Sequence, residues 1–132
     1  MKTIEENKDI GILMLRLLVA GLLIFHGVGN FLNGYEFIKS MMVQSGLPTF
    51  LGYGAFIGEI IAPLCIIIGY KERWASLFVV VTMVLAIITT HAGEIFSLNQ
   101  FGGWAIELQA FYLFGAVVIF FTGSGKYAID RK

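Results

Sequence analysis

The sequence predicts an all-α integral membrane protein, a bundle of four transmembrane helices with both termini in the cytoplasm. Composition is the first indication, because 58% of the 132 residues are hydrophobic and only 14% are charged, whereas soluble domains carry about 25% charged residues. The second is the presence of four apolar segments near the length of roughly 20 residues that a helix needs to cross a bilayer. The third is the uneven distribution of Lys and Arg between the loops. Together these observations predict a single membrane domain over residues 1–132.

The four predicted spans are apolar along nearly their whole length, and a lone strand there would leave backbone amides unpaired in lipid. They cover residues 10–31, 51–70, 74–91 and 104–121. Trp74 and Trp104 lie at span ends, where amphipathic rings prefer the membrane interface. The loop at 32–50 has apolar residues at helical spacing, followed by Gly46 and Pro48, which predicts a short amphipathic helix on the outer surface.

Orientation follows from the basic residues of the loops, because Lys and Arg are enriched on the cytoplasmic side. Lys39 belongs to one side, and the other side carries Lys2, Lys8, Lys71, Arg73, Lys126, Arg131 and Lys132. Both termini and the turn between the second and third spans are therefore expected in the cytoplasm, with the loops at 32–50 and 92–103 outside. Acidic and basic residues balance at nine each, so no nucleic-acid partner is expected.

Ionisable residues inside the spans are the candidates for function, because such groups cost at least ~2.5–3.5 kcal/mol at mid-bilayer and usually face a partner or a cavity. At a rise of about 1.5 Å per residue, each span contributes one such group to the outer half of the bilayer, and these are the candidate catalytic residues His26, Glu59, His91 and Glu107. Glu94, just beyond the third span, and Arg16, nearer the cytoplasmic end, are candidate ligand-binding residues. For Arg16 a purely structural role is favoured, as an anchor or as the partner of a helix C-terminus.

Glu59 has a proline four residues after it. Pro63 has no N–H to donate to the Glu59 carbonyl, and its ring pushes that carbonyl aside, so a distorted helix is expected here. A freed carbonyl and a carboxyl at one position would bind a proton donor, a water or a cation. His26 is the expected neighbour of the Glu59 carboxyl.

Three interpretations of this outer layer compete. In the first, the side chains only join helices through hydrogen bonds, worth about 0.6 kcal/mol per pair on average. In the second, they form a proton-coupled site for a quinone or a similar hydrophobic redox molecule, because His and Glu accept and relay protons. In the third, two His and several carboxylates hold a metal or haem, although the Glu-x-x-His pairs of di-iron bundles are missing and no metal ligand is assigned. Transport fits less well, because four short helices show no inverted repeat.

Five strings, weak individually, form a specific pattern by their order and spacing: LMLRLLVAGLLIFHGVGNF, GLP, GEIIAPLCIIIGYKERWASL, TTHAGEIF and TGSGKYAID. From about Ile10 to Asp130 the chain resembles the DoxX family of small four-helix bacterial membrane proteins. Two departures occur: Asn30 stands near a position where members often carry a lysine, and Ser124 where a proline is usual. Neither departure is expected to touch the titratable cluster.

The resemblance implies a multi-pass protein of the bacterial inner membrane. The family includes DoxD-like subunits of thiosulfate:quinone oxidoreductase and partners of membrane-associated oxidoreductase complexes, and it supplies no agreed set of active residues. We therefore expect a small redox-associated subunit whose outer layer surrounds a quinone-like molecule or a proton path. The alternative is a non-catalytic scaffold or assembly factor. Its expected partners are the lipid bilayer and either a larger oxidoreductase complex or further copies of the chain.

Overall fold

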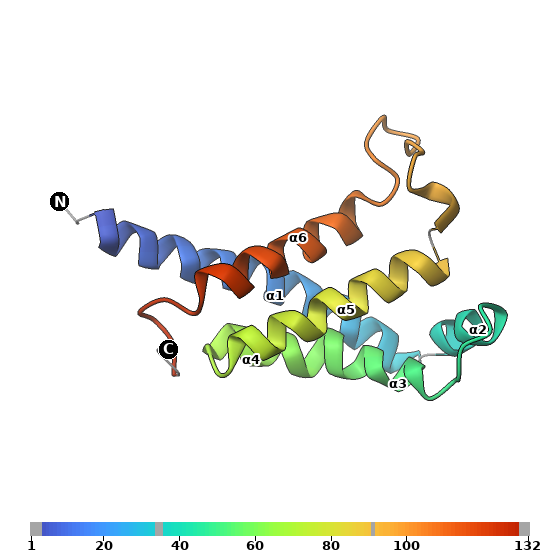
Figure 1. Cartoon of the computed structure of the whole chain (residues 1–132), viewed down its shortest axis with the longest axis horizontal. Coiled ribbons are helices and arrows are strands. Elements are labelled where there is room, and N and C mark those ends of the chain that lie inside the picture. Colours follow the sequence, from blue (N-terminus) through green and yellow to red (C-terminus); the bar gives the residue numbers. More distant parts are fainter. Residues whose placement is uncertain (1–3, 34–35, 91, 130–132) are drawn as a thin grey trace.

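The computed structural model describes residues 4–33, 36–90 and 92–129, and over these ranges the protein is all-α (Figure 1). In chain order the elements are α1 (Ile4–Leu32), α2 (Glu36–Gln44), α3 (Leu51–Phe56), the π-helical turn η1 (Ile57–Ile61), α4 (Ala62–Ile68), α5 (Glu72–Thr90), the 3-10 turn η2 (Ala92–Glu94) and α6 (Glu107–Thr122). The elements α3, η1 and α4 follow one another without a break and form one rod. The all-α class is confirmed, and a helix occupies each predicted segment, including the short one in the first loop.

Four helical segments pack into a bundle: α1, the α3–η1–α4 rod, α5 and α6. Both α1 and α5 contact α4, η1 and α6. The start of α1, the turn between α4 and α5 and the segment 123–129 lie at one end of the bundle, which we call the tail end (Figure 1). The other end, which we call the loop end, holds α2, α3 and the segment 92–106.

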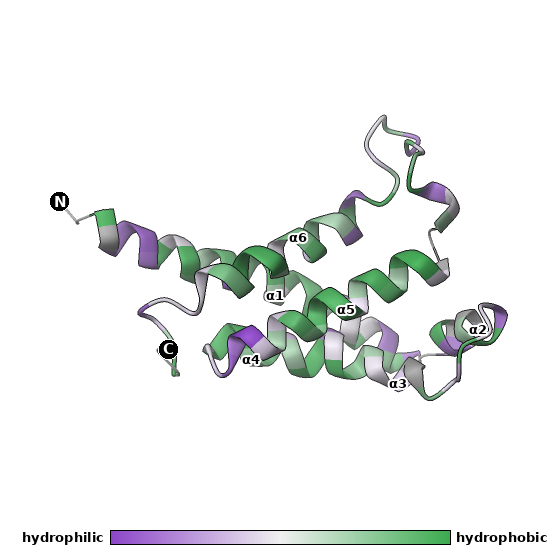
Figure 2. Cartoon of the chain, viewed as in Figure 1, coloured by the Kyte–Doolittle hydropathy of each residue, from purple (hydrophilic) through white to green (hydrophobic). Residues whose placement is uncertain are grey.

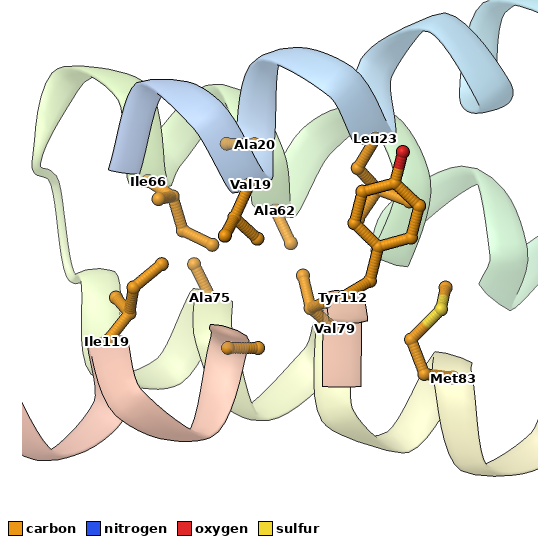
Figure 3. Close-up of a cluster of buried hydrophobic side chains, with 11 residues drawn as sticks. Val19, Ala20, Leu23, Ala62, Ile66, Ala75, Val79, Met83, Tyr112 and Ile119 are labelled. Carbon is orange, nitrogen blue, oxygen red and sulfur yellow. The ribbon is translucent and has the colours of Figure 1, made fainter. Parts of the chain in front are cut away.

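The core consists of side chains from all four segments (Figure 3). Alanines are frequent in it, and small residues allow helix backbones to approach closely, which increases the dispersion contacts between them. The core residues are Val19, Ala20, Leu23, Ala62, Ile66, Ala75, Val79, Met83, Tyr112, Ala116 and Ile119.

Hydrophobic residues dominate the helices of the bundle (Figure 2), and many large apolar side chains on its outside are exposed. Phe25, Phe114 and Phe121 are 77%, 60% and 75% exposed, and a surface of this kind marks an interaction with lipid or with another protein. Two of the described helices, at Glu6–Leu32 and Glu72–Thr89, are long and apolar enough to cross a membrane, while those at Tyr53–Ile68 and Glu107–Thr122 are shorter apolar helices. These features suggest that the protein associates with membranes.

The distortion expected at Glu59 takes the form of a π turn. In η1 the N–H of Ala62 donates to the carbonyl of Ile57, five residues back, and Pro63, which has no N–H to donate, follows directly after this turn. Single π turns inside α-helices occur frequently at functional sites. Here the turn contains Glu59.

Two glycines let neighbouring helices close on this π turn. A Cβ atom at Gly27 of α1 would collide with the Glu59 carbonyl oxygen, and one at Gly58 would collide with the Thr82 hydroxyl of α5. Both glycines are buried. The backbone around Glu59 therefore packs closely against both α1 and α5.

Arg16 holds the tail end of the bundle together. Its guanidinium is fully buried and donates hydrogen bonds to the carbonyls of Ile66 and Ile67 at 2.9 and 2.7 Å, at the C-terminus of α4. It also donates to the carbonyls of Ser124 and Tyr127 at 2.9 and 2.7 Å. These contacts confirm the interpretation of Arg16 as the partner of a helix C-terminus. The side chain is enclosed by protein.

The fourth helix begins later than predicted, at Glu107 instead of residue 104. Trp104 belongs to the preceding loop, where it forms an isolated antiparallel bridge with Leu98 and its indole N–H donates to the Ile95 carbonyl at 2.6 Å. The Asn99 side-chain oxygen accepts bonds from two backbone N–H groups of the same loop. Trp104 thus closes a folded loop, which hydropathy alone did not distinguish from a helix start.

Candidate functional site

A cavity of about 280 Å³ lies toward the loop end of the bundle, between α1, α2, η1, α5 and α6. We call it the polar chamber, after five polar side chains in its lining: His26, Asn30, Glu59, Gln109 and Tyr112. Apolar side chains form the rest of its described lining, and these are Leu23, Ile38, Met83, Ala86 and Leu108. The chamber thus has equal numbers of polar and apolar side chains in its described lining.

The Glu59 carboxyl group is buried, at 8% exposure, in the wall of the chamber. Its Oε2 accepts a hydrogen bond of 2.7 Å from Nδ2 of Asn30. The expectation that Asn30 stays clear of the titratable cluster is therefore wrong, because Asn30 is the hydrogen-bond donor to Glu59. His26, the expected neighbour, lines the same chamber. Asn30 follows His26 by four residues on α1, so both side chains lie on the same helix face.

His26 and Tyr112 bring two contacting aromatic rings to the lining. Their rings meet edge to face, with centroids 5.7 Å apart and an interplanar angle of 78°, a favourable arrangement for aromatic pairs. Tyr112 is buried in the core, whereas His26 is exposed on the outer side of the bundle. His26 therefore reaches both the chamber and the surface beside it.

The remaining predicted site residues lie elsewhere. Glu107 is exposed at the first position of α6 and Glu94 is exposed in η2, and neither is among the described residues that line the chamber. Arg16 lies toward the tail end, bound to the backbone carbonyls described above. His91 lies outside the described residues. Of the six predicted residues, the chamber thus brings together His26 and Glu59.

A metal centre has no ready set of ligands in the described part of the chain. Leaving aside His91, no group of three or more His, Cys, Asp or Glu side chains lies close enough to hold a metal ion. The three chamber residues that the sequence prediction missed, Asn30, Gln109 and Tyr112, are neutral. Their signal was spacing, since Asn30 follows His26 by one helical turn and Tyr112 follows Gln109 by three residues.

A second cavity, of about 220 Å³, adjoins the chamber between α2, α3, η1 and α5. We call it the apolar groove, and its lining consists of Ile38, Met42, Gly54, Ala55, Ile57, Glu59, Phe78, Val81, Thr82, Leu85, Ala86 and Thr89. It shares Ile38, Glu59 and Ala86 with the chamber. Glu59 therefore lies at the junction of the two cavities.

Helix α2, which contributes to both cavities, is attached to α3 through Lys39. The ammonium group lies 4.8 Å from the centroid of the Tyr53 ring and 3.7 Å from the Glu36 carboxylate. Its hydrogen bond to Tyr53 raises the pKa of Lys39, with a smaller contribution from the charge of Glu36. The contact with Tyr53 links α2 to α3 at the loop end, whereas Glu36 lies on α2 itself.

The fold and the chamber define a class of small helical bundle with a polar site near one end. The family follows from sequence comparison: residues 11–92, more than half of the chain, match the model of the DoxX family, and the chain belongs to this family. The matched region contains His26, Asn30 and Glu59, so three of the chamber's five polar residues lie within it.

Two relatives cover almost the whole chain. A Haemophilus influenzae protein described as "Uncharacterized protein" is 30% identical over 138 residues, which cover 100% of this chain and 97% of the relative. A Bacillus subtilis (strain 168) protein named "Putative oxidoreductase CatD" is 27% identical over 126 residues, which cover 96% of this chain and 89% of that protein. No solved structure matches the chain.

Proposed function

We propose that the protein is a small subunit of a quinone-linked oxidoreductase system in the bacterial inner membrane, and that its polar chamber binds the ring of a quinone-like molecule. The observation that carries this proposal is the chamber itself, with a buried carboxyl group and an imidazole in its wall. The relative named as an oxidoreductase supports a redox association. The electron donor would be another component of the same system.

Embedding in the membrane is supported by the apolar outer surface and by helix length. At about 1.5 Å per residue, the 6, 5 and 7 residues of α3, η1 and α4 extend ~27 Å and the 16 residues of α6 extend ~24 Å. These lengths fall slightly short of a hydrocarbon core of about 30 Å, a mismatch that local thinning of the bilayer can absorb. The proposed arrangement is therefore four spans.

The proposed orientation places the tail end in the cytoplasm. Lys8, Lys71, Arg73 and Lys126 belong to the segments that meet at this end, whereas Lys39 belongs to α2 at the loop end (Figure 1). Lys and Arg are enriched in cytoplasmic loops. The polar chamber then lies toward the outer side of the membrane.

We expect reporters fused to the N-terminus and to the C-terminus both to be active in the cytoplasm, because four spans return the chain to its starting side. A reporter inserted in the exposed loop at residue 100 should be active outside. Green fluorescent protein fusions report a cytoplasmic location, and alkaline phosphatase fusions report a location outside. A C-terminus on the outer side would contradict the four-span arrangement and would remove one helix from the membrane.

The chemistry of the chamber suits a quinone ring. Its volume is close to the lower end of the range of about 300–1,000 Å³ for small-molecule pockets, enough for a ring but not for a long attached chain. The two carbonyl oxygens of a quinone accept hydrogen bonds, and the Tyr112 hydroxyl, the His26 ring and the amides of Asn30 and Gln109 are donors. Reduction of a quinone takes up protons, and His26 and Glu59 are side chains that can deliver them.

Binding of a tail-less quinone to the purified, detergent-solubilised protein tests this proposal. We expect saturable binding that weakens about tenfold in His26→Phe, the equivalent of one lost hydrogen bond, because phenylalanine keeps the edge-to-face contact with Tyr112 and removes the ring nitrogens. Lys126→Ala, at the tail end, serves as the control and should bind normally. No saturable binding by the wild type would refute the proposal, and stable co-purification with a larger enzyme despite loss of the chamber residues would favour a scaffold.

A further inference from the structure

The apolar groove is continuous with the polar chamber, because Ile38, Glu59 and Ala86 line both cavities. We infer that the groove holds the hydrocarbon tail of the molecule whose ring occupies the chamber, so that the ligand is a long-chain lipoquinone. This inference rests on the proposed function and extends it by naming the ligand class. A ring in the chamber beside Glu59 would have its substituent directed past Glu59 into the groove.

The lining of the groove has few polar groups that could bind water in place of a hydrocarbon chain. Its two threonine hydroxyls are already bonded within α5: Thr82 donates to the Phe78 carbonyl at 2.8 Å and Thr89 to the Leu85 carbonyl at 2.7 Å. A hydroxyl that donates to its own helix has used its one proton and can only accept further hydrogen bonds. Apart from Glu59, which the groove shares with the chamber, the described lining therefore offers no free hydrogen-bond donor, and water would gain few hydrogen bonds there.

The outer end of the groove opens on the surface of the bundle. Ile57, Phe78 and Val81 line it and are 40%, 52% and 50% exposed, whereas Met42 of α2 covers the loop-end side and is buried. In the proposed orientation this opening faces the hydrocarbon of the bilayer. A tail longer than the groove can therefore continue into lipid between the rod and α5.

Gly54 provides a way to fill the groove without moving a helix. It lies in the groove lining, and a Cβ atom added there would meet no heavy atom within 4 Å. A leucine at this position would extend into the space assigned to the tail. Gly29 of α1 is a matched control, because an added Cβ has equally open surroundings there and Gly29 is not among the described residues that line either cavity.

The test compares a ubiquinone that has a long isoprenoid tail with its tail-less ring analogue, by titration of the detergent-solubilised protein. In Gly54→Leu we expect the affinity for the long-tailed quinone to fall about tenfold or more and the affinity for the tail-less ring to change less than about twofold. Gly29→Leu should leave both affinities unchanged. Val81→Phe, which narrows the groove from α5, should also lower the affinity for the long-tailed quinone only. It provides an independent test if Gly54→Leu folds poorly.

The outcomes separate the two proposals. Unchanged binding of both quinones in folded Gly54→Leu and Val81→Phe would overturn the tail assignment and would leave the chamber proposal intact. An equal loss for both quinones would overturn it too, because the groove would then not distinguish the tail. If wild-type protein binds neither quinone, the proposed function fails together with this inference.

Discussion

Replacing Glu59 with glutamine is expected to lower quinone-dependent electron transfer in membranes containing the protein by about 100-fold or more, the range of a lost general acid or base. Glutamine has nearly the size of glutamate, and its side-chain oxygen can still accept the hydrogen bond from Asn30. The free energy of unfolding of the variant should therefore lie within about 1 kcal/mol of the wild-type value. Activity assays and thermal unfolding of the same preparations measure the two effects.

Two further variants separate proton transfer from packing at this position. Glu59→Leu removes the acceptor of the Asn30 bond inside the bundle, so it should lower stability by roughly 1–3 kcal/mol as well as activity. Glu36→Gln changes an exposed carboxylate at the loop end and should alter neither property. Full activity of Glu59→Gln would exclude Glu59 as a proton carrier, and an equally large loss of stability would favour the interpretation of the layer as interhelical hydrogen bonding.

Replacing Arg16 with alanine is expected to destabilise the folded protein by about 3–5 kcal/mol, because several hydrogen bonds from a charged donor, each worth about 1.5–3 kcal/mol and not fully additive, are lost together. The variant removes the Arg16 donor from four buried or half-buried backbone carbonyls, of which the Ile66 carbonyl keeps a bond from the Gly69 N–H, and unpaired buried polar groups are costly. Thermal unfolding in detergent measures the loss. Limited proteolysis should also show faster cleavage of the segment 123–129, since Arg16 bonds it to the end of α4.

Arg16→Lys should be intermediate, because one ammonium group cannot reproduce the forked geometry that reaches carbonyls from two segments. Arg73→Ala is the control: Arg73 is an exposed arginine at the same end of the bundle, and its loss should change stability by less than about 0.5 kcal/mol. An Arg16→Ala protein as stable as the wild type would contradict the structural role assigned to this side chain.

The helices could be predicted well from the sequence, because apolar segments of sufficient length form helices in lipid regardless of which neighbours they contact. The predicted helix limits differ from the observed ones in two situations: where polar residues extend a helix, and where an aromatic residue lies in a loop instead of a helix. Helix α1 begins at Ile4, in the acid-rich stretch before the predicted start at residue 10. Trp104 folds into a loop because its indole N–H finds a backbone acceptor there, and hydropathy carries no information about such a contact.

The site could be predicted only in part, because counting residues gives depth along a helix but not the face on which a side chain lies. His26 and Glu59 lie at a similar depth, and both line the chamber. Glu107 is two residues before Gln109, about 200° around the helix at 3.6 residues per turn, and only Gln109 lines the chamber. Asn30 was overlooked because a search for ionisable groups passes over a neutral amide, although that amide is the donor to Glu59.

The central claim is that the polar chamber holds a quinone ring, and photolabelling with an azido-ubiquinone tests it most directly. Protein labelled in detergent would be digested, and the modified peptides identified by mass spectrometry. The account predicts labels within residues 23–30 of α1 or 108–112 of α6, where the chamber-lining side chains of these helices lie, and loss of label when excess unlabelled ubiquinone is present. Labels confined to other parts of the chain, or labels in these segments that excess quinone does not displace, would contradict it.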